Sequence, residues 1–162
     1  MTIAVFGATG QLGRLTIDAL LARGVAADRI RALGRNPERL AELADAGVAT
    51  FTIDLDDAST LAAPLQGADE VFLISGSEVG KRLPQHRAAI DAAVAAGVRR
   101  ITYTSAPRAD VSTLVLAPEH KATEEYLAAS GLTTTILRDG WYTENYQPDF
   151  GVAQATGVIA NS

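Results

Sequence analysis

The sequence predicts an α/β fold in which helices cover both faces of a parallel sheet. Six short apolar runs, rich in β-branched residues, alternate with segments that have helical spacing. Runs such as "VFLIS" are apolar throughout rather than at every second position, which is typical of parallel strands buried on both faces. Because parallel strands need right-handed crossovers, the predicted architecture is a doubly wound, Rossmann-like domain.

The six predicted strands cover residues 2–6, 29–33, 48–53, 70–75, 100–104 and 133–137. Apolar residues with helical spacing separate them, most clearly between residues 89 and 97. The pair Asn36-Pro37 is typical of a helix start. From Asn145 onward the pattern weakens, and no further element is predicted. Four glycines are typical of helix ends: Gly24, Gly47, Gly97 and Gly131.

The composition excludes several classes of site. The chain has 162 residues with 14 Lys and Arg against 19 Asp and Glu, and its basic residues form no run, so we expect neither a nucleic-acid nor a membrane-surface partner. It has no cysteine, and its two histidines, His86 and His120, lie too far apart for a local metal motif, so no metal is predicted. No apolar stretch approaches the length of a membrane helix, and we expect a cytoplasmic protein.

The stretch "VFGATGQLGRLT" places Gly7, Gly10 and Gly13 between the first strand and the first helix. Glycines at such a turn can be purely structural, since they tolerate positive φ and allow close packing. At this position, however, the amides of residues 9–12 and the helix dipole face outward without a partner. The motif therefore predicts a site for the pyrophosphate of a dinucleotide.

The end of the second strand indicates which dinucleotide is bound. NAD-binding domains usually place an acidic residue there for the ribose 2′-hydroxyl, but this chain has Gly34 followed by Arg35. A guanidinium suits a 2′-phosphate, so the sequence favours NADP. Asp54, after the third strand, has two equally weighted interpretations: an acceptor for the adenine amino group or a helix cap.

The usual general acid of short-chain reductases, a Tyr with a Lys four residues later, is missing. The residues four positions before Lys81 and Lys121 are Ser77 and Ala117. A quinone or a cationic dye accepts hydride without such an acid and can take its proton from water, so acceptors of this kind are favoured. No catalytic residue is assigned. Two residues each have two open interpretations. Ser105 either polarises a substrate oxygen or is a cap or turn residue. His120 either donates a proton or is a surface or capping residue.

The stretch "RDGWYTENY", residues 138–146, contains the only Trp and two of the four Tyr. These aromatic side chains can stack on a flat substrate ring that Arg138 and Asn145 orient. Alternatively, Trp141 and Tyr142 seal the core where a C-terminal segment docks.

Several motifs together resemble a known family. "FGATGQLG", "GRNPE", "ISGSEVG", "ITYTS", "EHKATE" and "GWYTENY" are similar to the NADPH-dependent quinone oxidoreductases of the NmrA-like, atypical short-chain dehydrogenase group, with triphenylmethane reductase as a near relative. The resemblance extends from residue 2 to about residue 159. It implies a quinone substrate and NADP as cofactor. Asp139 stands where the family commonly has Asn.

The resemblance also implies specific contacts. Cofactor contacts are expected from Gly7, Thr9, Gly10, Gln11, Leu12, Arg35, Ser75, Gly76, Ser77, Arg138 and Gly140, and substrate contacts from Trp141, Tyr142 and Asn145. Residues 1–144 are expected to form the NAD(P)-binding domain, and residues 145–162 to begin a C-terminal substrate segment that is cut short. The implied activity is hydride transfer to a quinone. The alternative is a redox sensor of the NmrA type without turnover, and a homodimer is an open alternative to a monomer.

Overall fold

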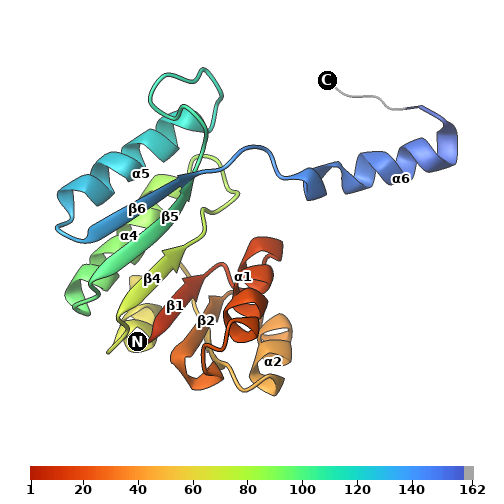
Figure 1. Cartoon of the computed structure of the whole chain (residues 1–162). Helices are drawn as coiled ribbons and strands as arrows, with labels where there is room; N and C mark the ends of the chain where they lie inside the picture. The colour runs from red at the N-terminus through yellow and green to blue at the C-terminus, as the bar shows by residue number, and fades with distance from the viewer. Residues whose placement is uncertain (159–162) are drawn as a thin grey trace.

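The computed structural model describes residues 1–158, which contain one parallel sheet of six strands in the order β3-β2-β1-β4-β5-β6 (Figure 1). All six predicted strands are confirmed, with ends that differ by at most two residues. Their bounds are β1 (Ile3–Phe6), β2 (Ile30–Gly34), β3 (Ala49–Thr52), β4 (Glu70–Leu73), β5 (Arg100–Ser105) and β6 (Thr133–Arg138).

The predicted helices are confirmed as α1 (Gln11–Ala22), α2 (Pro37–Asp45), α4 (Arg82–Ala95) and α5 (Ala117–Ala129). Asn36 caps α2 by accepting a hydrogen bond from the Arg39 amide at 3.0 Å. The four glycines predicted at helix ends all have positive φ. Two helices were not predicted, α3 (Ala62–Leu65) and α6 (Gln147–Thr156), nor were the short 3₁₀ turns η1 (Ala27–Arg29), η2 (Ala58–Thr60) and η3 (Thr143–Tyr146).

Helices lie on both faces of the sheet (Figure 1). Alternating side chains of β1 pack in two cores, one on each face. On one face, Ala4 and Phe6 of β1 belong to a core that includes Leu65 of α3 and Ile90 of α4. On the other face, Val5 packs in a second core with residues of α1 and α2. Because both faces of β1 are buried, its apolar run shows no alternation, as the sequence predicts for a parallel strand.

Helical cover of the second face is incomplete, which differs from the prediction. The second core extends from α1 and α2 over β1, β2 and part of β4. On β5 and β6 the same face carries Thr102, Thr135 and Leu137, which are half-buried or exposed. Threonine tolerates both strand geometry and water, so this half of the sheet does not need an apolar layer. Helix α6 does not cover it, because it projects away from the sheet (Figure 1).

The strand order reverses between β1 and β4, which are hydrogen-bonded neighbours. The chain runs to one side of β1 through β2 and β3, and to the other side through β4, β5 and β6. Such a reversal opens a crevice at the carboxyl ends of the central strands, where open α/β folds bind ligands. Within residues 1–158, none of the helices has the length and apolar character needed to span a bilayer.

Candidate functional site

The glycine turn lies in this crevice, between β1 and α1. Gly7 has a φ of +74°, and the Gly10 amide donates to the Gly7 carbonyl oxygen at 2.9 Å, which closes the turn. The expectation that all amides of residues 9–12 are free is therefore wrong for Gly10. Among the described residues, the amides of Thr9, Gln11 and Leu12 have no protein acceptor. They leave an anion site at the start of α1.

Gly13 allows α1 to approach the turn closely. A Cβ atom at this position would overlap the Gly7 carbonyl oxygen and lie 2.7 Å from the Ala8 Cα atom. Both neighbours are backbone atoms, which cannot rotate away as a side chain can. The third glycine of the motif is thus required by packing, while the first two shape the turn.

Two pockets flank the glycine turn and share Gly7, Gly10 and Ile74. We call the first, of about 260 Å³, the Arg35 pocket, and the second, of about 440 Å³, the Tyr142 pocket. Of the predicted site residues, the Arg35 pocket is lined by Gly7, Thr9, Gly10, Arg35, Ser75, Gly76 and Ser77, and the Tyr142 pocket by Gly7, Gly10, Gln11, Leu12, Tyr142 and Asn145. Segments far apart in sequence therefore meet where the resemblance implies cofactor and substrate.

Arg138, Gly140 and Trp141 line neither of these two pockets in the part of the chain that the structure describes. Arg138 is bound on both sides of its guanidinium: it donates to Glu124 at 3.0 and 2.7 Å and to Asp110 at 3.1 Å. Trp141 is 67% exposed, so the interpretation that it seals the core is wrong.

Arg35 lies at the mouth of its pocket with its guanidinium 2.7 Å from a carboxylate oxygen of Glu78. Glu78 also lies 3.5 Å from the Lys81 ammonium, which reaches Asp56 at 3.4 Å. The hydrogen bond from Arg35, followed by the charge of Lys81, lowers the pKa of Glu78 below its ordinary value. Glu78 is therefore ionised at neutral pH and competes with any anion for Arg35. Sequence analysis missed Glu78 because nothing local marks it as a partner of a residue 43 positions away.

Asp54 lines the Arg35 pocket and does not cap a helix, which removes one of its two interpretations. Its side chain accepts from the Asp56 amide at 2.9 Å in a local turn. The cap of η2 is instead Asp57, which accepts from the Ser59 amide at 3.0 Å. The adenine contact of Asp54 stays a prediction.

Neither candidate proton donor is available to a ligand. Ser105 is buried and donates its hydroxyl hydrogen to Glu124 at 2.5 Å, so it is neither a cap nor a free donor. His120 is also buried, and its Nδ1 shares a hydrogen bond of 2.7 Å with the Tyr103 hydroxyl, so the expectation of a surface or capping residue is wrong. Burial lowers the pKa of His120 to about 4 and raises the pKa of Tyr103.

Tyr142 lies beside the glycine turn, with its hydroxyl donating to Asp139 at 3.2 Å. Burial and the Asp139 charge raise the pKa of Tyr142 to about 12, so the phenol keeps its proton at neutral pH. The ring therefore offers the Tyr142 pocket an apolar face and a fixed polar end. Glu144 also lines this pocket and was not predicted.

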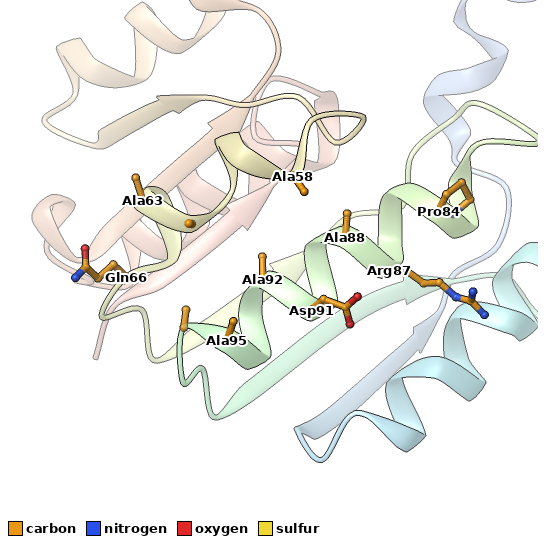
Figure 2. A pocket seen from close by; sticks show the side chains of 11 residues that line it. Ala58, Ala63, Gln66, Pro84, Arg87, Ala88, Asp91, Ala92 and Ala95 are labelled. Atoms are coloured by element: carbon orange, nitrogen blue, oxygen red, sulfur yellow. The ribbon is translucent and has the colours of Figure 1, made fainter.

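A larger hollow, of about 1040 Å³, lies elsewhere, between α4 and the segment that includes η2 and α3 (Figure 2). Small side chains such as Ala58, Ala88 and Ala92 line it. It contains no predicted site residue and no group at the carboxyl ends of the strands. The two smaller pockets at the glycine turn are the candidate site, because the chemistry of their lining matches a dinucleotide.

Comparison with known proteins agrees with this geometry. The family described as NAD(P)H-binding matches residues 7–161. Quinone oxidoreductase 2 of Escherichia coli K12 is 49% identical over 97% of this chain and 54% of its own length. The structure of an NADPH-dependent quinone oxidoreductase from Escherichia coli in complex with NADPH matches with a TM-score of 0.89, at 48% identity, over 96% of this chain and 55% of that one.

The triphenylmethane reductase of Citrobacter sp., solved with NADP(H), matches with a TM-score of 0.88 at 36% identity, over 94% of this chain and 54% of that one. The chain thus spans about half the length of the curated relatives it matches. The resemblance inferred from the motifs is confirmed, and the chain belongs to the NAD(P)H-binding family.

Proposed function

We propose that this chain binds NADPH and supports its use as a hydride donor to a quinone-type ring. The observation that carries the proposal is the meeting of the Arg35 pocket and the Tyr142 pocket at Gly7, Gly10 and Ile74. One pocket offers a cation at its mouth, the shared turn offers free amides, and the other pocket offers an aromatic ring. The name of the quinone oxidoreductase relative and that of the matching NADPH-bound structure support the same activity.

The residues fit this cofactor. Arg35 would hold the 2′-phosphate, and the amides of Gln11 and Leu12 the pyrophosphate. The shared wall at Ile74 leads from there to the Tyr142 pocket, which would take the nicotinamide and the quinone. When bound, NADPH supplies the hydride, and a proton from water completes the reduction of the quinone to a hydroquinone. The protein contributes proximity and orientation, with Tyr142 and Asn145 positioning the ring.

We further propose that the segment beginning at Asn145 belongs to the substrate side of the protein. Residues 1–144 contain the whole sheet, whereas α6 projects from it and exposes Phe150 and Val152 (Figure 1). Exposed apolar side chains on a projecting helix suit a wall that closes over an apolar ligand.

The direct test is NADPH oxidation by this chain with a simple benzoquinone, followed at the nicotinamide absorbance band, with NADH as comparison. Turnover that prefers NADPH supports the reductase. Tight binding of NADPH without turnover would contradict it. Strong discrimination between NADPH and NADP, together with a protein partner, would then favour the redox sensor.

Replacing Arg35 tests the cofactor preference. We expect Arg35→Ala to raise the Kd for NADPH about tenfold and to leave the Kd for NADH unchanged, because only NADPH carries the 2′-phosphate. The effect is at the low end for a charge-assisted contact, since the side chain is 68% exposed. Arg99→Ala is the matched control. Arg99 lies just before β5, at the opposite end of the sheet from the site, and forms an ion pair with Asp69. Equal losses for both nucleotides would contradict the assignment.

Glu78→Gln is expected to act in the opposite direction. It removes the carboxylate that competes for Arg35, so the Kd for NADPH should fall about two- to fivefold. Fluorescence titration with NADPH measures the change. Glu70→Gln, next to Arg100, makes the same charge change away from the site and should have no effect. Weaker binding by the Glu78 variant would show that Glu78 assists the cofactor instead.

A further inference from the structure

Three buried side chains hold the backbone of Ser75 and Gly76, just beyond the end of β4. The Ser75 amide donates to Thr104 Oγ1 at 2.8 Å. The Gly76 carbonyl oxygen accepts from Arg82 Nε at 2.9 Å, and the Gly76 amide donates to His86 Nε2 at 3.3 Å. Thr104, Arg82 and His86 are all less than 5% exposed. Side chains thus replace the strand ladder that ends at Leu73.

The side chains that reach Gly76 come from one face of α4. Its buried face begins with Arg82, Gln85 and His86 and continues with Ala89, Ile90 and Ala93. The apolar half packs in the core, whereas the polar half lies under the loop. The change from polar to apolar residues along one helical face is the mark that this arrangement leaves in the sequence.

Helix α5 fixes these side chains from the other side. Thr123 donates its hydroxyl hydrogen to the Glu119 carbonyl oxygen at 2.8 Å, so its oxygen accepts from His86 Nδ1 at 3.1 Å. His86 therefore carries its proton on Nδ1 and leaves Nε2 as the acceptor for the Gly76 amide. Arg82 donates to a Glu119 carboxylate oxygen at 2.8 Å, and the other oxygen accepts from the Gly80 amide at 3.1 Å.

This arrangement costs free energy that the fold alone does not require. A buried ion pair and a buried imidazole lose hydration, and apolar side chains of similar volume would serve stability as well. The polar groups converge on both sides of one residue, Gly76, whose loop lines the Arg35 pocket. A need to hold that loop in one orientation for ligand binding would account for this desolvation cost.

We propose that His86 and Arg82 are positioning residues for the dinucleotide, acting by fixing the backbone of Gly76. The inference rests on the proposed function, because it takes the Arg35 pocket to be part of the NADPH site. The Gly76 amide and carbonyl are directed into the protein, and the loop lines the pocket with Ser75, Gly76 and Ser77. The dinucleotide then meets a loop that is already ordered, which lowers the entropy cost of binding.

Two replacements of His86 distinguish the loss of its hydrogen bond with Gly76 from a general loss of stability. In His86→Gln the side-chain amide lies near the former Nε2 and can still accept from Gly76, whereas in His86→Asn it lies near the former Nδ1 and reaches only Thr123. Both lose the edge-to-face contact with Tyr103. We expect similar losses in Tm, but a Kd for NADPH about three- to tenfold higher only in His86→Asn. Ala93→Gly, on the apolar half of α4, is the stability control and should leave Kd within about twofold.

Hydrogen exchange of the Gly76 amide, measured by NMR without nucleotide, gives a second readout. Protection is expected in the wild type and His86→Gln and reduced in His86→Asn. Equal effects of the two variants on Kd and on exchange would overturn the inference. A wild-type chain that protects Gly76 but does not bind NADPH would instead overturn the proposed function, so the two failures are distinguishable.

Discussion

Gly13→Ala is expected to lower the free energy of unfolding by about 3 kcal/mol or more and to abolish measurable NADPH binding. The new methyl group would overlap the Gly7 carbonyl oxygen and crowd the Ala8 Cα atom, so α1 has to move away from the turn. Overpacking against rigid neighbours costs about 1–3 kcal/mol or more, and here the neighbours are backbone atoms. A displaced α1 also takes the amides of Gln11 and Leu12 away from the phosphate position.

Thermal unfolding and fluorescence titration with NADPH measure the two effects. For a domain of this size, a loss of about 3 kcal/mol lowers Tm by about 6–12 °C. Gly151→Ala is the matched control, because Gly151 lies in α6 with open space around the position of a Cβ atom. It should leave Tm unchanged or raise it slightly. A Gly13→Ala chain with wild-type Tm would contradict the packing argument.

The strands were predictable because burial on both faces leaves a local trace. The run from Ile3 to Phe6 is apolar throughout, and in β4 the three residues after Glu70 are apolar. Helix α3 has four residues, too few for a helical period to be recognised. Helix α6 does not pack on the sheet, so no apolar stripe is imposed on its sequence (Figure 1).

In the candidate site, too, some features were predictable from the sequence and others were not. The glycine turn was predictable because its demands on φ and on space act on single residues, Gly7 and Gly13. The pairing of Arg35 with Glu78 was not, because it depends on where two loops end in space. Arg138 was singled out by its position after a strand, but its partners Glu124 and Asp110 lie on other segments. Contacts between distant segments leave no local pattern.

Acidification is expected to destabilise the chain strongly between pH 7.5 and 5, through its two buried histidines. Burial, with the charge of Arg82, lowers the pKa of His86 to about 3 and that of His120 to about 4, against an ordinary value of 6.5. In the unfolded chain both histidines bind protons as the pH falls below 6.5, whereas in the folded chain they stay neutral until pH 4 or lower. The free energy of unfolding is therefore highest above pH 6.5 and decreases as the pH falls below that value.

The groups that face the two rings do not reverse this sign. Tyr103 stays neutral because burial raises its pKa. The carboxylate of Glu124 is raised in pKa by burial, but the hydrogen bonds from Arg138 and Ser105 outweigh burial and hold its pKa below the ordinary value. Glu119 forms an ion pair with Arg82 at 2.8 Å. Each histidine contributes about 2 kcal/mol to the loss between pH 7.5 and 5, or about 4 kcal/mol together.

Urea unfolding at several pH values measures this loss directly. His120→Gln removes one of the two titrations, so its stability should fall by about 2 kcal/mol over the same range, whatever its stability at pH 7.5. An unfolding free energy that is constant between pH 7.5 and 5 would contradict the buried, neutral state of both rings. His86 is neutral in the folded chain over this range, so its Nε2 remains an acceptor for the Gly76 amide. This hydrogen bond should therefore persist until the chain unfolds.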